Sequence, residues 1–312
     1  MNIKKYSFDD KILWDEFVKL AKNGHFFFLR DYMDYHADRF TDHSLLIYDD
    51  KNTLIALLPA NIEGKTLFSH QGLTFGGLLV KPSIKQVDVI NVFKYLKNYI
   101  KDIGVDKVIY KRIPYIYHTM PADEDLYALF RINAKLLRRD VSSAIDLKNQ
   151  IKYSKGRKWI VKKTQENGLV YEEISDVKCF WTILEMVLFE RHGVRPVHSY
   201  DEIEKLKNNF PASIKFYSSI YNNVILAGAV IFEVQNTVHT QYLFNTELGR
   251  SMGALDGLID HLVKNRYVDM RYFDFGISNE EQGLVLNEGL ISQKEGFGAR
   301  AITHDFYEIL SD

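Results

Sequence analysis

Residues 224–244 read VILAGAVIFEVQNTVHTQYLF, two strand-like runs joined by a Gln-Asn-Thr turn. Apolar runs of this length, bounded by turn residues, are typical of buried strands. After this hairpin, the apolar spacing predicts a helix over 252–266, a strand over 270–275, a helix near 284–295 and a strand over 300–310. Before it, helices are expected over 176–191 and 201–208, followed by a strand over 213–219. The stretch therefore lies in the middle of a mixed α and β unit.

The first half of the chain shows the same order of elements. Helices are expected over 10–22 and 32–38, strands over 44–48, 53–62 and 66–70, a helix over 84–100, a strand over 105–112, a helix over 123–130 and a strand over 134–147. Matching elements are offset by about 160–170 residues. We therefore predict an α/β (α+β) fold in which two tandem units each contain a mixed sheet flanked by helices.

The composition is that of a globular protein. The chain has 312 residues, 46% hydrophobic and 26% charged, which excludes disordered, collagen-like and disulfide-scaffold classes. Cys179 is the single cysteine, and no Cys/His spacing suits zinc, so no metal site is expected. The first residues do not resemble a signal peptide, and no apolar run reaches the ~20 residues of a membrane helix. These features favour a cytoplasmic protein without a membrane span.

The net charge of −1 hides a strong pattern. Residues 1–147 carry +2, residues 148–168 carry +6 and residues 169–312 carry −9. We predict a first domain over 1–147, a basic connector helix over 148–168 and a second domain over 169–312. The connector is either a solvated helix or a cationic wall for a phosphate-bearing ligand.

Candidate chemical groups gather between residues 238 and 300. Alternation predicts that His239 and Gln241 share one face of a strand. Residues 245–254 read NTELGRSMGA, a loop rich in small residues before a helix, which would let backbone N–H groups approach a phosphate. Asp274 ends an apolar strand, and Glu288 and Lys294 flank the apolar face of the next helix.

Several of these segments together resemble FemAB-type members of the GNAT acyltransferase superfamily. In the second half the resemblance rests on RHGVRPVH (191–198), Gln241-Tyr242, YFDFGIS (272–278), LNEGL (286–290) and KEGFGAR (294–300). In the first half it rests on FTDHSL (40–45) and SHQGLTFGG (69–77). Lys294-x-x-Phe297-Gly298 is similar to the Lys-x-x-Phe-Gly stretch of Fem transferases, whose lysine handles substrate charge. Arg250 and Gly253 match two landmarks of the acetyl-CoA pyrophosphate loop, and Leu255 stands at the third.

The resemblance implies two GNAT-like domains and acyl transfer to an amine on a sugar nucleotide or cell-surface glycan precursor, with acyl-CoA, most simply acetyl-CoA, as donor. His239 or Asp274 would relay the amine proton and Lys294 would offset charge, with Glu288 as a further catalytic candidate. The donor site would lie in the second domain, over 169–312, where Gly249, Arg250, Ser251, Gly253 and Ala254 would hold the donor phosphates. The acceptor would meet Arg191, His198, His70, Gln241 and Tyr242.

Two other hypotheses remain open at this point. A Fem-type enzyme would take its donor from aminoacyl-tRNA and act on a peptidoglycan precursor, and the basic connector favours this alternative. A non-catalytic nucleic-acid-binding or scaffold protein is a third hypothesis, which the overall neutrality of the chain disfavours.

Overall fold

The computed structural model describes residues 1–311, apart from the side chain of His192. The chain divides into two compact units, and each is described by itself. Unit 1 comprises 1–140, 281–284 and 303–312, and unit 2 comprises 141–280 and 285–302.

Unit 1 contains two small sheets and a long helix. Its strands are β1 (Asn2–Lys5), β2 (Thr41–Asp42), β3 (Leu45–Tyr48), β4 (Leu54–Leu58), β5 (Asn61–Glu63), β6 (Thr66–Phe68), β7 (Leu79–Val80) and β8 (Lys107–Lys111). Its helices are α1 (Lys11–Leu20), α2 (Arg30–Met33), α3 (Gln86–Asp102) and α4 (Glu124–Arg131), with short 3-10 turns between them. One sheet has the order β1-β3-β4-β7, and in the other β8 pairs in parallel with β6, which continues through β5 to β2. Residues of α3 spaced by three and four, such as Val89, Val92 and Phe93, fill its core.

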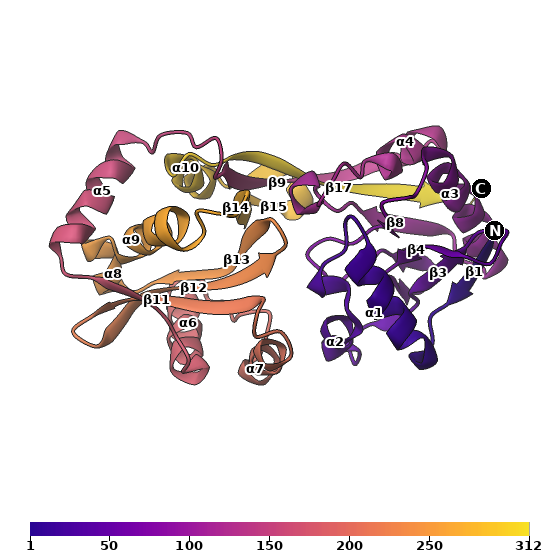
Figure 1. Cartoon of the computed structure of the whole chain (residues 1–312). Coiled ribbons are helices and arrows are strands. Elements are labelled where there is room, and N and C mark those ends of the chain that lie inside the picture. Colours follow the sequence, from indigo (N-terminus) through magenta and orange to yellow (C-terminus); the bar gives the residue numbers. More distant parts are fainter. Residues whose placement is uncertain (312) are drawn as a thin grey trace. The chain divides into compact units, whose positions relative to one another are not determined.

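Unit 2 is built on one larger sheet (Figure 1). Its strands are β10 (Val170–Glu173), β11 (Ile214–Tyr221), β12 (Val224–Val234), β13 (Thr237–Asn245) and β14 (Tyr272–Ile277), with a small β15/β16 pair (Asn279–Glu280 and Val285–Leu286). Its helices are α5 (Lys155–Glu166), α6 (Val177–His192), α7 (Tyr200–Asn209), α8 (Glu247–Met252), α9 (Ala254–His261) and α10 (Glu288–Gly296), and α9 runs on into a π-helical turn, Leu262–Arg266.

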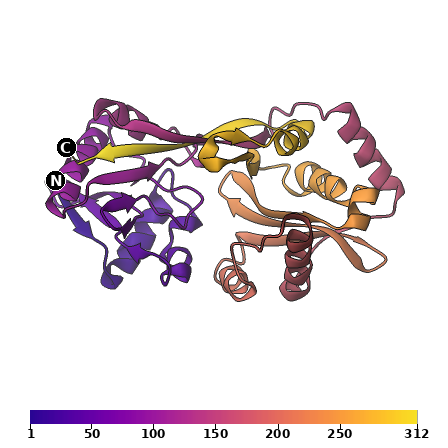
Figure 2. The same cartoon turned by 180° about the vertical axis from the view of Figure 1, so that it is seen from behind.

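The sheet of unit 2 is a meander with one parallel addition. β10, β11, β12 and β13 are antiparallel neighbours, and β14 then joins β13 in parallel. Helices α6 and α7 cover one face, while α9 covers the other, as both views show (Figures 1 and 2). Core residues of α9 and the sheet, including Leu258, Val238 and Phe273, lie on the α9 side.

Two long strands explain where the predicted domain boundaries differ from the units. β9 (Lys135–Asp146) begins in unit 1 and pairs with β14 in unit 2. β17 (Arg300–Leu310) begins in unit 2 and pairs through residues 306–310 with β8 in unit 1. Each half of the chain thus gives its last strand to the other unit, and the connector helix, α5, belongs to unit 2.

The predicted repeat of elements is present. β8 begins at 107 and β14 at 272, an offset of 165 residues, and α4 begins at 124 and α10 at 288, an offset of 164. β3 begins at 45 and β11 at 214, an offset of 169. The mixed α and β fold class is therefore confirmed. No helix among the described residues is long and apolar enough to cross a membrane.

Candidate active site in unit 2

His239 and Asp274 lie side by side where two parallel strands meet. They are directly paired across β13 and β14, and both are buried, with Asp274 wholly so. The Asp274 carboxylate accepts hydrogen bonds from the Ser142 hydroxyl and from the Gly276 N–H, at 3.2 Å. Its other oxygen lies 2.8 Å from His239 Nδ1. Because the carboxylate is an acceptor, it holds the imidazole with Nδ1 protonated and leaves the lone pair on Nε2.

The pairing of strands is interrupted at this pair. Pairing between β13 and β14 covers three residues and ends at His239 and Asp274, although both strands continue. The β14–β9 register also shifts between Asp274 and Ile277, and Gly276 has a φ of +74°, which glycine adopts without strain. His239 and Asp274, called the dyad below, therefore lie where β13 and β14 stop pairing. A substrate carbonyl can approach the backbone where two strands separate in this way.

Lys294 of α10 anchors the turn that follows Asp274. Its ammonium donates to the carbonyls of Gly276 (2.8 Å) and Ile277 (2.7 Å) and to the Ser278 hydroxyl (2.8 Å). An ammonium group has three donors, so all are used within the protein. Burial lowers the pKa of Lys294 to about 8, although the nearby Asp274 acts in the opposite direction. The contacts give Lys294 a positioning role beside the dyad.

The lowered pKa of Lys294 predicts a specific pH dependence of stability. Between pH 8 and 10.5 the unfolded chain keeps a proton that the folded chain releases, so the free energy of unfolding rises with pH. We expect wild type to gain up to about 1.4 kcal/mol per pH unit over this window, relative to Lys294→Met. Below pH 8 the difference should be flat. Urea denaturation of both proteins at pH 7, 8, 9 and 10 measures this difference in the free energy of unfolding. A difference that stays constant from pH 7 to 10 contradicts a lowered pKa of Lys294.

Glu288 lies apart from this network. It is exposed in the first turn of α10, after the Asn287 cap. An acid there is favourable for the helix dipole. The described contacts include no hydrogen bond or ion pair from Glu288 to His239 or Asp274.

The segment predicted as a phosphate-binding loop is mostly helical, so the loop expectation is wrong. Thr246 caps α8, and its side-chain oxygen accepts a hydrogen bond from the N–H of Gly249. The N–H groups of Arg250 and Gly253 are likewise bonded to backbone carbonyls. A Cβ at Gly249 would meet Asn245 and Leu226, because this glycine packs tightly under β12.

The N-terminus of α9 is covered by α5. A Cβ at Gly253 would contact Ile160 and Thr164 of α5, and Ala254 is fully buried. Asp256 in the first turn of α9 pairs with Arg157 of α5. Gly253 and Ala254 therefore serve helix packing, and an acid of the protein already complements the α9 dipole.

A cavity of about 890 Å³ lies on the other side of β12, which is a volume typical of ligand sites. Apolar side chains of α6 and β12, including Met186, Val187 and Leu226, line it. Arg191 of α6 and Arg250 and Ser251 of α8 lie along it as well. The structure thus brings one predicted acceptor residue together with two predicted donor residues.

A β-bulge at Gln241 interrupts the alternation expected along β13, although the Gln241 side chain still bonds the Tyr242 hydroxyl. A bulge places Thr240 opposite Ile231 and Tyr242 opposite Val230, so Gln241 is the extra residue. Tyr242 consequently shares the α6 face, where its hydroxyl lies 2.7 Å from His198 Nδ1 and its ring meets Trp181 edge-on. Burial raises the pKa of Tyr242. His198 and Tyr242 therefore form a second polar pair on that side of the sheet.

His70 belongs to unit 1. It is 3% exposed, stacks on His36 at 5.2 Å between ring centroids and has a φ of +66°, which is strained for a non-glycine residue. Burial and the neighbouring His36 lower its pKa to about 3, so the imidazole is neutral at pH 7.

Ser142 and Ser278 were not expected at the site. Ser142 is 132 residues from Asp274 in sequence and reaches it only because β9 joins the sheet of unit 2. Ser278 follows the Asp274 strand directly, so its position at a strand end was the available signal. Among the described residues no cluster of His, Cys, Asp or Glu suits a metal ion.

Comparison with known proteins identifies the fold. FemX superimposes with a TM-score of 0.69 at 10% identity, covering 99% of this chain and 97% of FemX. A tandem GNAT protein from the clavulanic acid biosynthesis pathway gives 0.54 at 10% identity, covering 100% and 98%. The chain has the tandem GNAT fold. The C-terminal domain of a putative lysylphosphatidylglycerol synthetase from Agrobacterium fabrum shares it, with 0.59 at 11% identity and coverage of 95% and 92%. No protein-family model and no curated protein matches the sequence.

The FemAB-like and GNAT resemblance noted in the sequence is thus confirmed as a resemblance of fold. At such low identities the superpositions show a shared fold only. The chemistry has to be inferred from the residues of this chain.

Proposed function

We propose that the protein is an N-acyltransferase that moves an acyl group to an amine on a sugar nucleotide or cell-surface glycan precursor. The observation that carries the proposal is the buried His239–Asp274 pair at the end of the β13–β14 ladder. A histidine held by a carboxylate in one tautomer is suited to general-base catalysis. The tandem GNAT fold supports this class of reaction.

The reaction forms a C–N bond and breaks the bond between the acyl carbon and its leaving group. The amine attacks the acyl carbonyl, and His239 Nε2 accepts the proton that the nitrogen loses. As the tetrahedral intermediate collapses, the His239 imidazolium returns that proton to the leaving thiolate or alkoxide and becomes neutral again. Asp274 stabilises the imidazolium that forms, and Lys294 fixes the turn of Gly276 and Ile277 beside it.

Acyl-CoA is the donor that the cavity suits. Arg191 and Arg250 offer guanidinium groups for phosphate there, beside Glu190 and Glu247, and the apolar wall suits a pantetheine arm. The Ser251 hydroxyl already donates to the Leu248 carbonyl. His239 precedes Asn245 of the cavity by six residues on β13, which is roughly 20 Å of strand. A donor anchored at Arg250 needs an extended arm to reach His239, and acyl-CoA has one. The His198–Tyr242 pair on the same sheet face would contact the acceptor.

The covered N-terminus of α9 favours a second donor. Because α5 closes that end, the usual position for a pyrophosphate is filled. An aminoacyl-tRNA donor, acting with a peptidoglycan precursor as acceptor, does not need a pyrophosphate-binding site at this helix end. Similarity of fold to FemX and to a lysylphosphatidylglycerol synthetase domain is consistent with aminoacyl transfer.

Ligand-induced stabilisation tests which donor binds. A donor present at 100 times its dissociation constant adds about 2.7 kcal/mol to the free energy of unfolding. We expect acetyl-CoA or a longer acyl-CoA to raise the melting temperature, and Arg250→Ala to abolish the shift. Stabilisation by aminoacyl-tRNA alone would transfer the proposal to the second donor. No response to either donor contradicts both.

A further inference from the structure

Helix α5 presents a cationic face with a tryptophan in its middle. Its exposed residues on one side are Lys155, Lys158, Trp159, Lys162 and Lys163. At 3.6 residues per turn these positions occupy about 140° of the helix circumference. Val161 and Thr164 point the other way and are buried, while Glu166 lies on the exposed side in the last turn. The exposed lysine Lys152 precedes the helix.

These lysines differ from the arginine in the same helix. Arg157 pairs with Asp256 and stacks over Phe297 at 4.4 Å, so it serves the packing of α5. In the described part of the chain no ion pair or hydrogen bond engages Lys155, Lys158 or Lys162. Lys163 lies over the Trp159 ring, at 5.6 Å to its centroid, and forms no ion pair with the described residues. The positive charges of this face are therefore not used to hold the fold together.

The position of the charges is unfavourable for the helix itself. Ser154 caps α5, and no acid lies in the first turn, where Lys155 and Arg157 stand instead. Cations at a helix N-terminus oppose the macrodipole. A sequence that keeps a locally unfavourable pattern on an exposed face points to a binding role for that face.

Trp159 supplies the second indication. Its side chain is 65% exposed, whereas Trp14 and Trp181 are 0% and 1% exposed. A large exposed aromatic ring among lysines is characteristic of helices that lie in a membrane interface, where the ring enters the headgroup region and the ammonium groups meet lipid phosphates.

We propose that α5 docks unit 2 on the surface of an anionic phospholipid bilayer. Lysine acts as a point charge on such a surface, whereas recognition of nucleic-acid phosphates favours the bidentate arginine fork. A large polyanion such as tRNA would also meet the −9 charge of residues 169–312, while a bilayer touched through one helix need not. Docking through α5 requires neither a particular donor nor the His239–Asp274 pair.

Trp159 makes the proposal directly measurable, because it is the exposed tryptophan of the three in the chain. Purified protein is mixed with vesicles of phosphatidylcholine containing about one-third phosphatidylglycerol, and with vesicles of phosphatidylcholine alone. We expect a blue shift of tryptophan emission, protection from aqueous quencher and co-sedimentation with the anionic vesicles, all reversed by high salt. A tryptophan emission spectrum that neither vesicle type changes overturns the proposal.

A pair of charge reversals provides the matched comparison. Lys155→Glu with Lys162→Glu should weaken vesicle binding by at least about tenfold, because each lysine near an anionic surface contributes severalfold to the affinity. Lys94→Glu with Lys101→Glu on α3 has the same charge change and the same spacing of exposed lysines, and should change binding less than twofold.

The α5 variant should also remain folded, since Lys155→Glu places an acid at the N-terminus of the helix. An unchanged melting temperature confirms this. Equal loss of vesicle binding in the α5 and α3 variants overturns the proposal. Binding of a transfer RNA by a wild-type protein that does not bind the vesicles also overturns it.

Discussion

Asp274→Asn is expected to lower turnover by about 10²–10⁴-fold. Asp274 is buried and accepts from His239, Ser142 and Gly276. An amide presents a donor to one of these groups and favours the imidazole tautomer with the proton on the wrong nitrogen. The base at Nε2 is then lost, although the side-chain volume is kept. Initial rates of amine acylation, with free CoA or free tRNA as second readout, measure the effect.

Asp146→Asn is the matched control. Asp146 lies on β9 opposite Tyr272 of the same β14 strand, but it is half-exposed and pairs with Arg271. We expect its turnover to stay within about twofold of wild type, since surface ion pairs contribute little. If Asp274→Asn retained wild-type turnover, or if both variants lost it equally, the dyad would have no special role. Binding of the donor by Asp274→Asn should remain near wild type.

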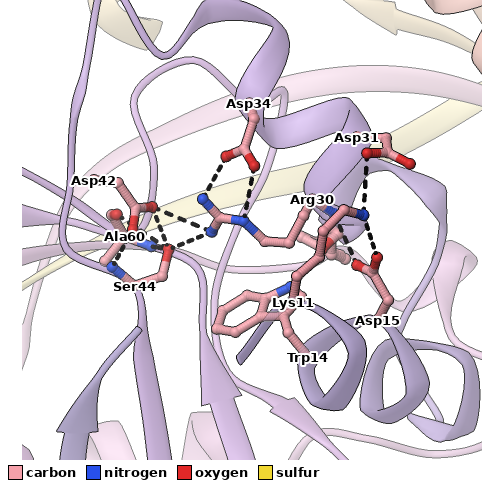
Figure 3. Close-up of polar contacts among 10 residues, drawn as sticks. Lys11, Trp14, Asp15, Arg30, Asp31, Asp34, Asp42, Ser44 and Ala60 are labelled. Atoms are coloured by element: carbon pink, nitrogen blue, oxygen red, sulfur yellow. Dashed lines mark hydrogen bonds and ion pairs between the residues drawn. The ribbon is translucent and has the colours of Figure 1, made fainter. Parts of the chain in front are cut away.

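Arg30→Met is expected to destabilise unit 1 by about 3–5 kcal/mol. Arg30 is 2% exposed and lies among Asp34, Asp42 and Ser44, as Figure 3 shows. Its guanidinium also lies over the Tyr6 ring, at 3.9 Å from the centroid. Removing the cation leaves two carboxylates beside a buried apolar side chain without their shared partner. With about 2–4 °C of melting temperature per kcal/mol, calorimetry should show a drop of roughly 6–20 °C.

Lys11→Met tests the same region at its surface. Lys11 bonds Asp15 at 2.8 Å and Asp31 at 3.0 Å, also drawn in Figure 3, but Asp31 is largely exposed. Water can replace these contacts, so a loss under about 1 kcal/mol is expected. A comparable loss for Lys11→Met and Arg30→Met would contradict the view that burial makes Arg30 important.

Periodicity predicted the elements because burial imposes it. The strand at 224–234 and the helix at 86–102 each place apolar residues where a sheet face or helix stripe needs them. His239 and Asp274 were identifiable for the converse reason, since polar groups inside apolar strands require partners. Their contact depends on register, which the sequence pattern does not contain.

The predictions that differ from the structure depend on long-range packing. Small residues at 249–254 suggested a loop, but Gly249 and Gly253 allow close packing against β12 and α5. The bulge at Gln241 and the contact of Ser142 with Asp274 arise from strand pairing over large sequence distances. The passage of β9 and β17 from one unit to the other also depends on such long-range strand pairing. No local sequence pattern predicts it.

Mass-spectrometric detection of an acylated amine tests the central claim most directly. Wild type, Asp274→Asn and Asp146→Asn are incubated with acyl-CoA or aminoacyl-tRNA and with amino-sugar nucleotides or peptidoglycan precursors. The account predicts one acylated product from wild type and Asp146→Asn, formed at least about 100-fold more slowly by Asp274→Asn. Product formed equally fast by all three proteins, or no product with any donor and acceptor, would contradict it.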